Sequence, residues 1–254
     1  ASTIDGIRLS KAKSRAFAHN NLADAEAKLQ EAEGLVFLSV ESIYSMNGHI
    51  APLQAMVELA EKYGAAVIVD EAHATGVVGQ YGEGLVQYLQ LEKRVFARVH
   101  TFGKALGVHG AVILGPDVLR QYLINFCRSF IFTTGPPFHT LIAIKEAYKM
   151  LLESSAERLH LAQLIQAFRQ YILSIKSDKL QLIDSVSPIQ GIIVKGNNEV
   201  RKLAHGLQQA GFDVRPIIPP TVPLGTERIR ICLHAFNTFE EVERFAVVLK
   251  GLVG

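Results

Sequence analysis

The sequence contains only two cysteines, Cys127 and Cys232, which are too few for a disulfide framework and fit a reducing compartment. It has almost no excess charge: 26 basic and 24 acidic residues give a net charge of +2, which argues against binding to nucleic acid or to an anionic membrane surface. The longest apolar runs are interrupted within about ten residues, whereas a membrane span needs roughly 20. Residues 1–15 carry charges throughout, unlike a signal peptide. These absences predict a soluble, cytoplasmic protein.

The 254 residues are 49% hydrophobic, which is enough for a substantial core. Apolar periodicity predicts helices at 20–33, 52–64, 117–128, 139–152, 155–176, 198–210 and 238–250, and strands at 35–40, 65–73, 94–104, 111–115, 189–195, 212–218 and 228–234. The strands at 35–40 and 65–73 enclose one helix and lie about 30 residues apart, as in a parallel βαβ unit. The run AVILG (111–115) reads as a further buried strand.

The pattern changes near Ser154, where one long helix is followed by short strands and helices. Leu159, Ala162, Ile165 and Phe168 are expected on the buried face of that helix. We therefore predict an α/β protein with a large domain at 1–154, built on a mainly parallel sheet, and a smaller α+β domain at 155–254.

Polar residues follow several of the predicted strands, and ligands of open parallel sheets bind beyond the carboxyl ends of their strands. The residues concerned are Ser45, Asn47 and His49; Asp70, Glu71 and His73; and His100, Thr101 and Lys104. Several polar strand ends at one edge of a sheet favour a functional site over ordinary loop residues.

Lys104 lies in the glycine-bearing, mostly apolar segment TFGKALG. Desolvation there would lower the pKa of its amine, and a neutral amine can form a Schiff base with an aldehyde. A surface lysine in a loop is the alternative interpretation. Asp70 ends the most hydrophobic strand, where an acid needs a cationic partner such as a protonated pyridine nitrogen, or else caps the following turn. His73, three residues on, is expected on the same rim, although a lone histidine is usually structural.

Hydroxyl and guanidinium groups supply further candidates. Thr101, Thr133 and Thr134 have hydroxyls suited to phosphate, or else serve as local turn residues. Arg228 and Arg230 alternate in a predicted strand and share a face, so that one of them is able to hold a substrate carboxylate through two hydrogen bonds. The alternative is a solvent-facing strand edge.

Four segments together resemble the α-oxoamine synthases, which are fold-type I pyridoxal-phosphate enzymes. They are VDEAHATGVVGQYGEG (69–84), HTFGKALGVHGAVILG (100–115), SPIQ (187–190) and RPIIPPTVPLGTERIRICLHAFNT (215–238), and the similarity begins near IDGIRLS (4–10). The resemblance implies an aspartate-aminotransferase-like fold and a homodimer with its site at the subunit interface. The segments are most similar to the 8-amino-7-oxononanoate synthase branch of biotin synthesis.

The resemblance also implies roles for individual residues. Lys104 would be the Schiff-base lysine, Asp70 would pair with the pyridinium nitrogen, and His73 would contact the phenolic oxygen of pyridoxal 5'-phosphate. Ser45 and Thr101 would approach the cofactor, Thr134 would reach the phosphate bound to the neighbouring subunit, and Arg230, not Arg228, would hold the amino acid carboxylate. No metal is implied.

The implied reaction is a decarboxylative condensation of an amino acid, L-alanine for this branch, with an acyl thioester, pimeloyl-CoA or its carrier-protein equivalent, to give 8-amino-7-oxononanoate. The alternative within the family is a glycine C-acetyltransferase or serine palmitoyltransferase type. Family members have a substantial segment before the one that resembles IDGIRLS, with a phosphate loop and a side chain that stacks on the cofactor ring. We therefore expect the large domain to be incomplete at its N-terminus and this chain alone to bind cofactor weakly or to be inactive.

Three interpretations from other classes remain. VDEAH also spells the acidic box of DEAH-type helicases, but Lys104 is followed by Ala105, and no G-x-x-x-x-G-K-[ST] loop is present. Asp70, Glu71, His73 and His100 are residue types that bind metals in hydrolases, without an H-E-x-x-H or C-x-x-C motif to support them. The third is a non-enzymatic scaffold that keeps the fold.

Overall fold

The computed structural model describes residues 2–254, and within them the chain forms two compact units. Unit 1 runs to Ser42, resumes at Ala51 and ends at Glu153, while unit 2 comprises Ile43–Ile50 and Ser154–Gly254. The short segment 43–50 thus belongs to unit 2 although its neighbours in sequence belong to unit 1. The predicted division into domains at 1–154 and 155–254 stays a prediction. Among the described residues no helix is long and apolar enough to cross a membrane.

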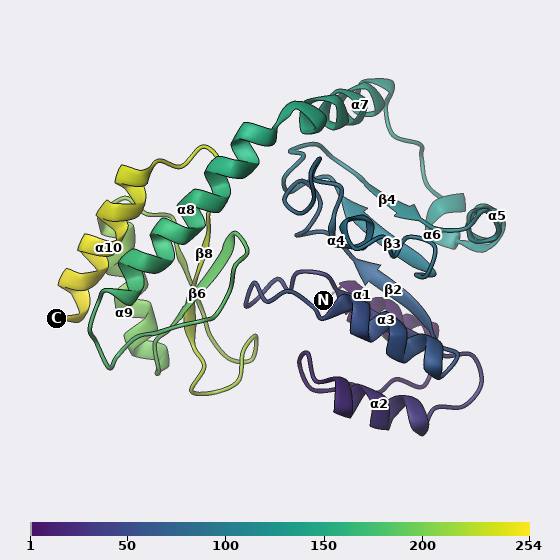
Figure 1. Ribbon diagram of the computed structural model, residues 1–254, viewed down its shortest axis with the longest axis horizontal. Coiled ribbons are helices and arrows are strands. Elements are labelled where there is room, and N and C mark those ends of the chain that lie inside the picture. Colours follow the sequence, from purple (N-terminus) through teal and green to yellow (C-terminus); the bar gives the residue numbers. More distant parts are fainter. Residues whose placement is uncertain (1) are drawn as a thin grey trace. The chain divides into compact units, whose positions relative to one another are not determined.

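Unit 1 contains a four-stranded sheet and seven helices within residues 2–153 (Figure 1). Its strands are β1 (Phe37–Glu41), β2 (Ala66–Asp70), β3 (Ala97–Thr101) and β4 (Ala111–Leu114), and its helices are α1 (Ser2–Ser10), α2 (Leu22–Gln30), α3 (Leu53–Lys62), α4 (Leu85–Tyr88), α5 (Asp117–Phe126), α6 (Arg128–Ile131) and α7 (Phe138–Glu153). The strands lie in the order β1-β2-β3-β4, with β1, β2 and β3 parallel. The sheet is therefore mainly parallel, and β1, α3 and β2 form the predicted βαβ unit.

Helix α3 shows why this unit folds as it does. Leu53, Met56, Val57 and Ala60 recur at helical spacing and are all buried, so the helix has one continuous apolar face. The helix follows Pro52 and ends before Gly64, whose φ of +65° suits glycine. It packs against β2, with α2 beside it (Figure 1).

Strand β4 differs from its prediction. It pairs antiparallel with β3, ends the sheet, and alternates between exposed and half-buried residues, with Ile113 50% exposed. The expectation of a buried strand at 111–115 was therefore wrong. The apolar run AVIL indicates a strand, but whether an apolar strand is covered on both faces depends on what packs against it.

Unit 2 is an antiparallel sheet with three helices on one side (Figure 1). Its strands are β5 (Gln181–Leu182), β6 (Ile189–Ile193), β7 (Arg215–Ile217) and β8 (Arg228–Cys232), in the order β5-β6-β8-β7, and its helices are α8 (Ser155–Leu173), α9 (Asn197–Gln209) and α10 (Phe239–Val253). Ile192, Ile229 and Ile231 of the sheet pack against the helices in one core. The other face of β8 therefore carries Arg228 and Arg230.

The buried stripe of α8 also differs in part from its prediction. Ile165 and Phe168 are buried as expected, but Leu159 is 62% exposed and Ala162 is also exposed. Leu164 and Ile172 complete the stripe instead. Positions 164, 165, 168 and 172 have helical spacing too, so periodicity alone permits either stripe, and the contact with β5 and α10 selects the second.

Candidate functional site

Asp70 and His73 lie where β2 ends. The carboxylate of Asp70 is half-buried, and its Oδ1 accepts a hydrogen bond from Ala72 N at 2.9 Å. The chain then turns helically, because both Ala74 N and Thr75 N donate to Glu71 O, and His73 lies within this turn. One carboxylate oxygen of Asp70 thus caps the turn, as the alternative interpretation expected, while Oδ2 has no hydrogen bond within residues 2–254. Capping and pairing with a cation are compatible.

Thr101 lies at the same edge of the sheet. Strand β3 is parallel to β2, and Asp70 is in register with Val99, so Thr101 extends two residues past that pair. Thr101 Oγ1 is buried and has no hydrogen-bond partner within residues 2–254. A buried hydroxyl without a partner is uncommon in folded proteins and indicates a missing polar partner.

Lys104 follows Thr101 in a tight turn. Phe102 N donates to Gly110 O at 2.9 Å, and Gly107 N donates to Lys104 O at 3.1 Å. Phe102 points into the core against Tyr148, whereas Lys104 is exposed, so the prediction that apolar neighbours desolvate the amine was wrong for this structure. The physical reason is that Phe102, two residues before Lys104, points into the protein while residues 103–105 lie at the surface.

Behind this edge, Glu71, Thr75 and His100 form a buried polar network that sequence reasoning missed. Glu71 is 0% exposed, its Oε1 accepts from Val86 N at 3.0 Å, and its Oε2 lies 3.3 Å from His100 Nε2. Thr75 Oγ1 donates to Glu71 O at 2.9 Å and lies 3.0 Å from His100 Nδ1. The contact between Glu71 Oε2 and His100 Nε2 does not have the geometry of a hydrogen bond, so it is a close approach of two polar groups.

This arrangement bears on the metal-hydrolase interpretation. Glu71 and His100 point into the interior, whereas Asp70 caps a turn at the sheet edge. In the part of the chain that the structure describes, no three His, Cys, Asp or Glu side chains converge as metal ligands do. Glu71 and His100 act as a structural pair here.

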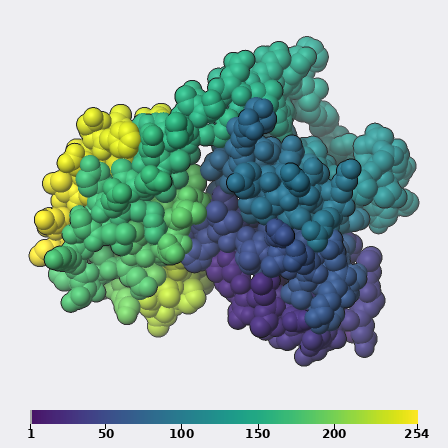
Figure 2. Space-filling model, in the orientation of Figure 1, coloured from purple at the N-terminus to yellow at the C-terminus, as the bar shows by residue number. Residues whose placement is uncertain are grey.

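Thr133 and Thr134 lie in the loop between α6 and α7, and both are exposed. The surrounding segment is unusually apolar for a surface: Phe126, Phe130, Phe132 and Phe138 are each between 61% and 77% exposed. Helices α5, α6 and α7 bury none of their residues within the described chain. Figure 2 shows this part of unit 1 in teal. A large exposed apolar surface is typical of a protein–protein interface.

Arg228 and Arg230 lie in unit 2 on β8, which is hydrogen-bonded to β6 on one side and β7 on the other. The interpretation of a solvent-facing strand edge was therefore wrong. Arg228 is 7% exposed, its Nε donates to Thr226 O at 3.0 Å, and burial lowers its pKa. Arg230 is half-buried, and its Nε donates to Ser45 O at 2.8 Å. No carboxylate of the described residues forms an ion pair with Arg230.

Ser45 belongs to the segment 43–50, which unit 2 includes. Two of the predicted site residues, Ser45 and Arg230, therefore meet in unit 2. The others, Asp70, His73, Thr101, Lys104 and Thr134, belong to unit 1: Asp70 and Thr101 are the last residues of β2 and β3, and His73 and Lys104 follow three residues later. The sequence pattern identified Ser45 as a candidate because it follows a predicted strand. It did not reveal the contact with Arg230, because the two residues are 185 positions apart.

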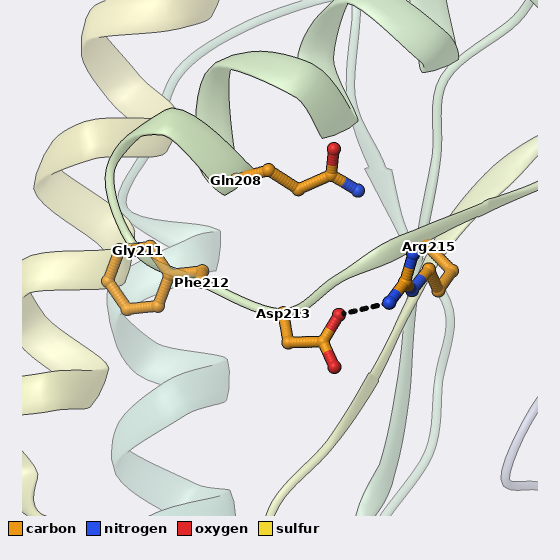
Figure 3. A pocket seen from close by; sticks show the side chains of 5 residues that line it. All are labelled: Gln208, Gly211, Phe212, Asp213 and Arg215. Carbon is orange, nitrogen blue, oxygen red and sulfur yellow. Dashed lines mark ion pairs between the residues drawn. The ribbon is translucent and has the colours of Figure 1, made fainter.

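A hollow of about 310 Å³ lies at the turn between α9 and β7, away from these residues in sequence (Figure 3). Gln208, Gly211, Phe212, Asp213 and Arg215 line it. Figure 3 shows Arg215 directed at Asp213, and their charged atoms are 3.0 Å apart. Both side chains are more than 70% exposed, so the ion pair is well solvated and contributes little to stability. None of the predicted site residues lines this hollow.

Known proteins resemble the chain over nearly its whole length. Residues 1–249 match the family "Aminotransferase class I and II". The 8-amino-7-oxononanoate synthase of Emericella nidulans is 43% identical over 261 residues, covering 96% of this chain and 63% of that protein. The chain therefore spans less than two thirds of the length of this relative.

Solved structures give the same result for the fold. The 8-amino-7-oxononanoate synthase of Francisella tularensis superposes with a TM-score of 0.86 at 30% identity, covering 99% of this chain and 72% of that one. A serine palmitoyltransferase from S. paucimobilis, solved with a bound PLP–myriocin aldimine, superposes with a TM-score of 0.92 at 26% identity and is covered to 64%. The aminotransferase-like fold expected from the sequence is confirmed. The chain belongs to the aminotransferase class I and II family and, within this pyridoxal-phosphate-dependent family, to the α-oxoamine synthases.

Proposed function

We propose that the protein to which this chain belongs is an acyltransferase that condenses L-alanine with a pimeloyl thioester to give 8-amino-7-oxononanoate. The observation that carries the proposal is the grouping of Asp70, Thr101 and Lys104 at the ends of two adjacent parallel strands in a member of this family. The 43% identity to a synthase of that name supports the choice of branch.

The side chains at this edge suit pyridoxal phosphate chemically. Lys104 offers an exposed primary amine that an aldehyde is able to reach. Asp70 has one carboxylate oxygen without a hydrogen bond within the described residues, suited to a protonated ring nitrogen. The buried hydroxyl of Thr101 lacks a partner that a polar cofactor atom would supply. These three groups fit the cofactor, and we propose that they hold it together with His73 at its phenolic oxygen and Ser45 near the ring.

The chain's own residues account for the proton transfers and the charges. When bound, the cofactor withdraws electrons from the α-carbon of the amino acid, which makes that carbon acidic. Lys104 takes the proton from the α-carbon and later returns one. Asp70 stays ionised and stabilises the positive charge of the ring nitrogen, and its capping hydrogen bond from Ala72 N keeps the carboxylate in place.

In the overall reaction the Cα–H bond of the amino acid and the C–S bond of the thioester break, and a Cα–C bond forms. The thiolate leaves and takes up one proton, the carboxylate departs as carbon dioxide, and a proton is added to the α-carbon, so that one proton is taken up from solvent overall. Until then Arg230 holds the carboxylate. Its Nε is engaged with Ser45 O, which leaves the two terminal nitrogens as a fork for two parallel hydrogen bonds.

We also propose a homodimer formed through α5, α6 and α7. The apolar side chains that these helices expose need a covering surface, and a second copy of the chain provides one. Thr134 lies in the same exposed segment and would contact the phosphate in the partner's site. The proposed partners are thus an amino acid, an acyl-CoA or acyl carrier protein, and a second copy, without nucleic acid or membrane, in the cytoplasm.

A serine palmitoyltransferase-type reaction is the second candidate, supported by the TM-score of 0.92 to the S. paucimobilis enzyme. The test is the absorbance change of the cofactor-loaded protein on adding L-alanine, glycine or L-serine, followed by detection of the condensation product with pimeloyl, acetyl and palmitoyl thioesters. Selectivity for L-alanine and pimeloyl thioester supports the first proposal. Selectivity for L-serine with the palmitoyl thioester would replace it with the second.

A further inference from the structure

The loop of residues 43–50 is held in unit 2 by a buried serine. Ser185 is 2% exposed, and its Oγ is 3.0 Å from Gly48 O and 2.7 Å from Ile189 O, so that the two carbonyls share its single hydroxyl proton. Gly48 is buried with a φ of +72°, and a Cβ at this position would collide with Ile189 O and Ser185 Oγ. The contact is therefore closely packed, and it requires glycine.

Ser185 is itself firmly placed. Its carbonyl accepts hydrogen bonds from Gln190 Nε2 at 2.9 Å and from Arg169 Nη1 at 2.7 Å. Gln190 is 0% exposed and also donates to Ser187 O at 2.7 Å. Ser187 Oγ lies 3.0 Å from Ser185 Oγ, and it accepts from Ile189 N at 3.2 Å. Ser187 shares this environment but has no hydrogen bond to Gly48.

Backbone hydrogen bonds close the loop on either side of Ser45 and so link the position of Ser45 to that of Gly48. Gly48 N donates to Tyr44 O at 2.8 Å, and Tyr44 N donates to His49 O at 2.9 Å. Ile43 and Ile50 form a β-bridge at its base. These backbone contacts make the loop a single rigid turn, so an anchor at Gly48 also fixes the carbonyl of Ser45.

Ser45 O accepts the hydrogen bond from Arg230 Nε at 2.8 Å. An arginine side chain has many rotamers, and a guanidinium held at Nε keeps its two terminal nitrogens in one plane and one direction. Arg230 is opposite Gly191 on one neighbouring strand and Arg215 on the other. The carbonyl of Ser45 is thus the acceptor that orients Arg230 from outside its own sheet.

We propose that Ser185 is a positioning residue for the substrate carboxylate, acting through Gly48 and Ser45 on Arg230. The inference rests on the proposed role of Arg230 in binding the amino acid. Without the Ser185 hydroxyl the loop loses its buried anchor, the Ser45 carbonyl moves more freely, and the fork of Arg230 is no longer pre-oriented. The loss falls on carboxylate binding and leaves binding of the amino group unchanged.

The experiment compares Ser185→Ala with the control Ser187→Ala, which removes a neighbouring buried hydroxyl that packs near Gly48 but makes no hydrogen bond to the loop. Hydrogen–deuterium exchange of residues 43–50, measured without added cofactor, is expected to be about tenfold faster in Ser185→Ala only. The cofactor-loaded protein is then titrated by absorbance with L-alanine and with ethylamine, which lacks a carboxylate. The apparent Kd for L-alanine is expected to rise about tenfold in Ser185→Ala, with that for ethylamine unchanged.

A third variant, Arg230→Gln, separates the two proposals. If it weakens binding of L-alanine but not of ethylamine, the role of Arg230 stands, and an unchanged L-alanine Kd in Ser185→Ala then overturns the inference about Ser185 alone. Unchanged exchange of residues 43–50 in Ser185→Ala, or equal effects in Ser187→Ala, overturns it as well. If Arg230→Gln affects both amines equally, the role of Arg230 in carboxylate binding fails, and the inference falls with it.

Discussion

The carboxylate of Glu71 lies 3.3 Å from His100 Nε2 in the interior of unit 1, with the two side chains 0% and 6% exposed. Glu71 follows Asp70 directly and His100 precedes Thr101, so the pair joins the ends of the two strands that carry the proposed cofactor contacts. The pair itself points away from that edge. Its contribution is therefore to keep the two strand ends in register.

Replacing Glu71 with alanine is expected to destabilise the protein by about 2–4 kcal/mol. The change leaves Val86 N without its acceptor and His100 Nε2 facing an apolar gap. Urea denaturation gives the free energy of unfolding. The control is Glu92→Ala, which removes an exposed carboxylate and should change that free energy by less than about 0.5 kcal/mol. Equal effects of the two changes would show that the pair is not structural.

A substitution at Gly84, which packs against Glu71, tests the Glu71–His100 pair in a second way. Its φ is +98°, and a Cβ there would lie 2.6 Å from Glu71 Oε2. Gly84→Ala should therefore combine backbone strain with a steric clash, whereas Gly64→Ala, with a φ of +65° and no atom within 4 Å, carries strain alone. We expect Gly84→Ala to be the more destabilising by about 1–3 kcal/mol in the same urea experiment. A smaller loss for Gly84 than for Gly64 would mean that the Glu71 side chain moves aside freely.

The sequence predicts where the helices and strands of this fold lie better than it predicts which of their side chains are buried. The run AVIVD and the spacing of Leu53, Met56 and Val57 specify a strand and a helix locally, and both form. Burial of β4 and of Leu159 depends on which elements pack nearby, so periodicity alone predicted both wrongly.

At the site, the residues at the ends of β2 and β3 can be predicted from the sequence, because the carboxyl ends of parallel strands share one edge of the sheet. The contacts Ser45–Arg230 and Gly48–Ser185 join segments more than 130 residues apart, and no local pattern encodes them.

Lys104→Ala should abolish the visible absorbance that pyridoxal phosphate gains on binding to the protein. The amine of Lys104 is the group proposed to bond with the aldehyde, and its exposure means that its loss leaves the core intact. Absorbance spectra after gel filtration measure the bound cofactor. Lys93→Ala, at another exposed lysine, is the control and should keep the absorbance. An unchanged spectrum in Lys104→Ala would overturn the assignment.

Asp70→Asn is expected to lower kcat at least 100-fold with little change in thermal stability. Asparagine Oδ1 still accepts the hydrogen bond from Ala72 N, so the turn keeps its cap, but the negative charge opposite the ring nitrogen is lost. A 100-fold loss corresponds to about 2.7 kcal/mol, which is within the range for a hydrogen bond to a charged group. Steady-state kinetics and thermal unfolding measured on the same samples test this. A large fall in Tm with an unchanged kcat would assign Asp70 to capping alone.

The hydrogen bonds that the Glu227 carboxylate accepts lead us to expect a pH dependence of stability in unit 2. The backbone N–H groups of Gly196 and Gly225 donate to its carboxylate at 3.1 Å each, and these hydrogen bonds, that from Gly196 foremost, lower the pKa of Glu227 below its usual value. A carboxyl group whose pKa is lowered in the folded state stabilises the protein at pH values above its unfolded-state pKa. This stabilisation is lost as the pH falls through the folded-state pKa.

Glu227→Gln should therefore be less stable than the parent near neutral pH, and the difference in urea midpoint should shrink as the solution is made acidic. Glu243→Gln, at an exposed helix position, is the control and should give no such convergence. A difference between parent and Glu227→Gln that stays constant down to the acid transition would contradict the prediction, because it would mean that the hydrogen bonds from Gly196 and Gly225 do not favour the ionised form.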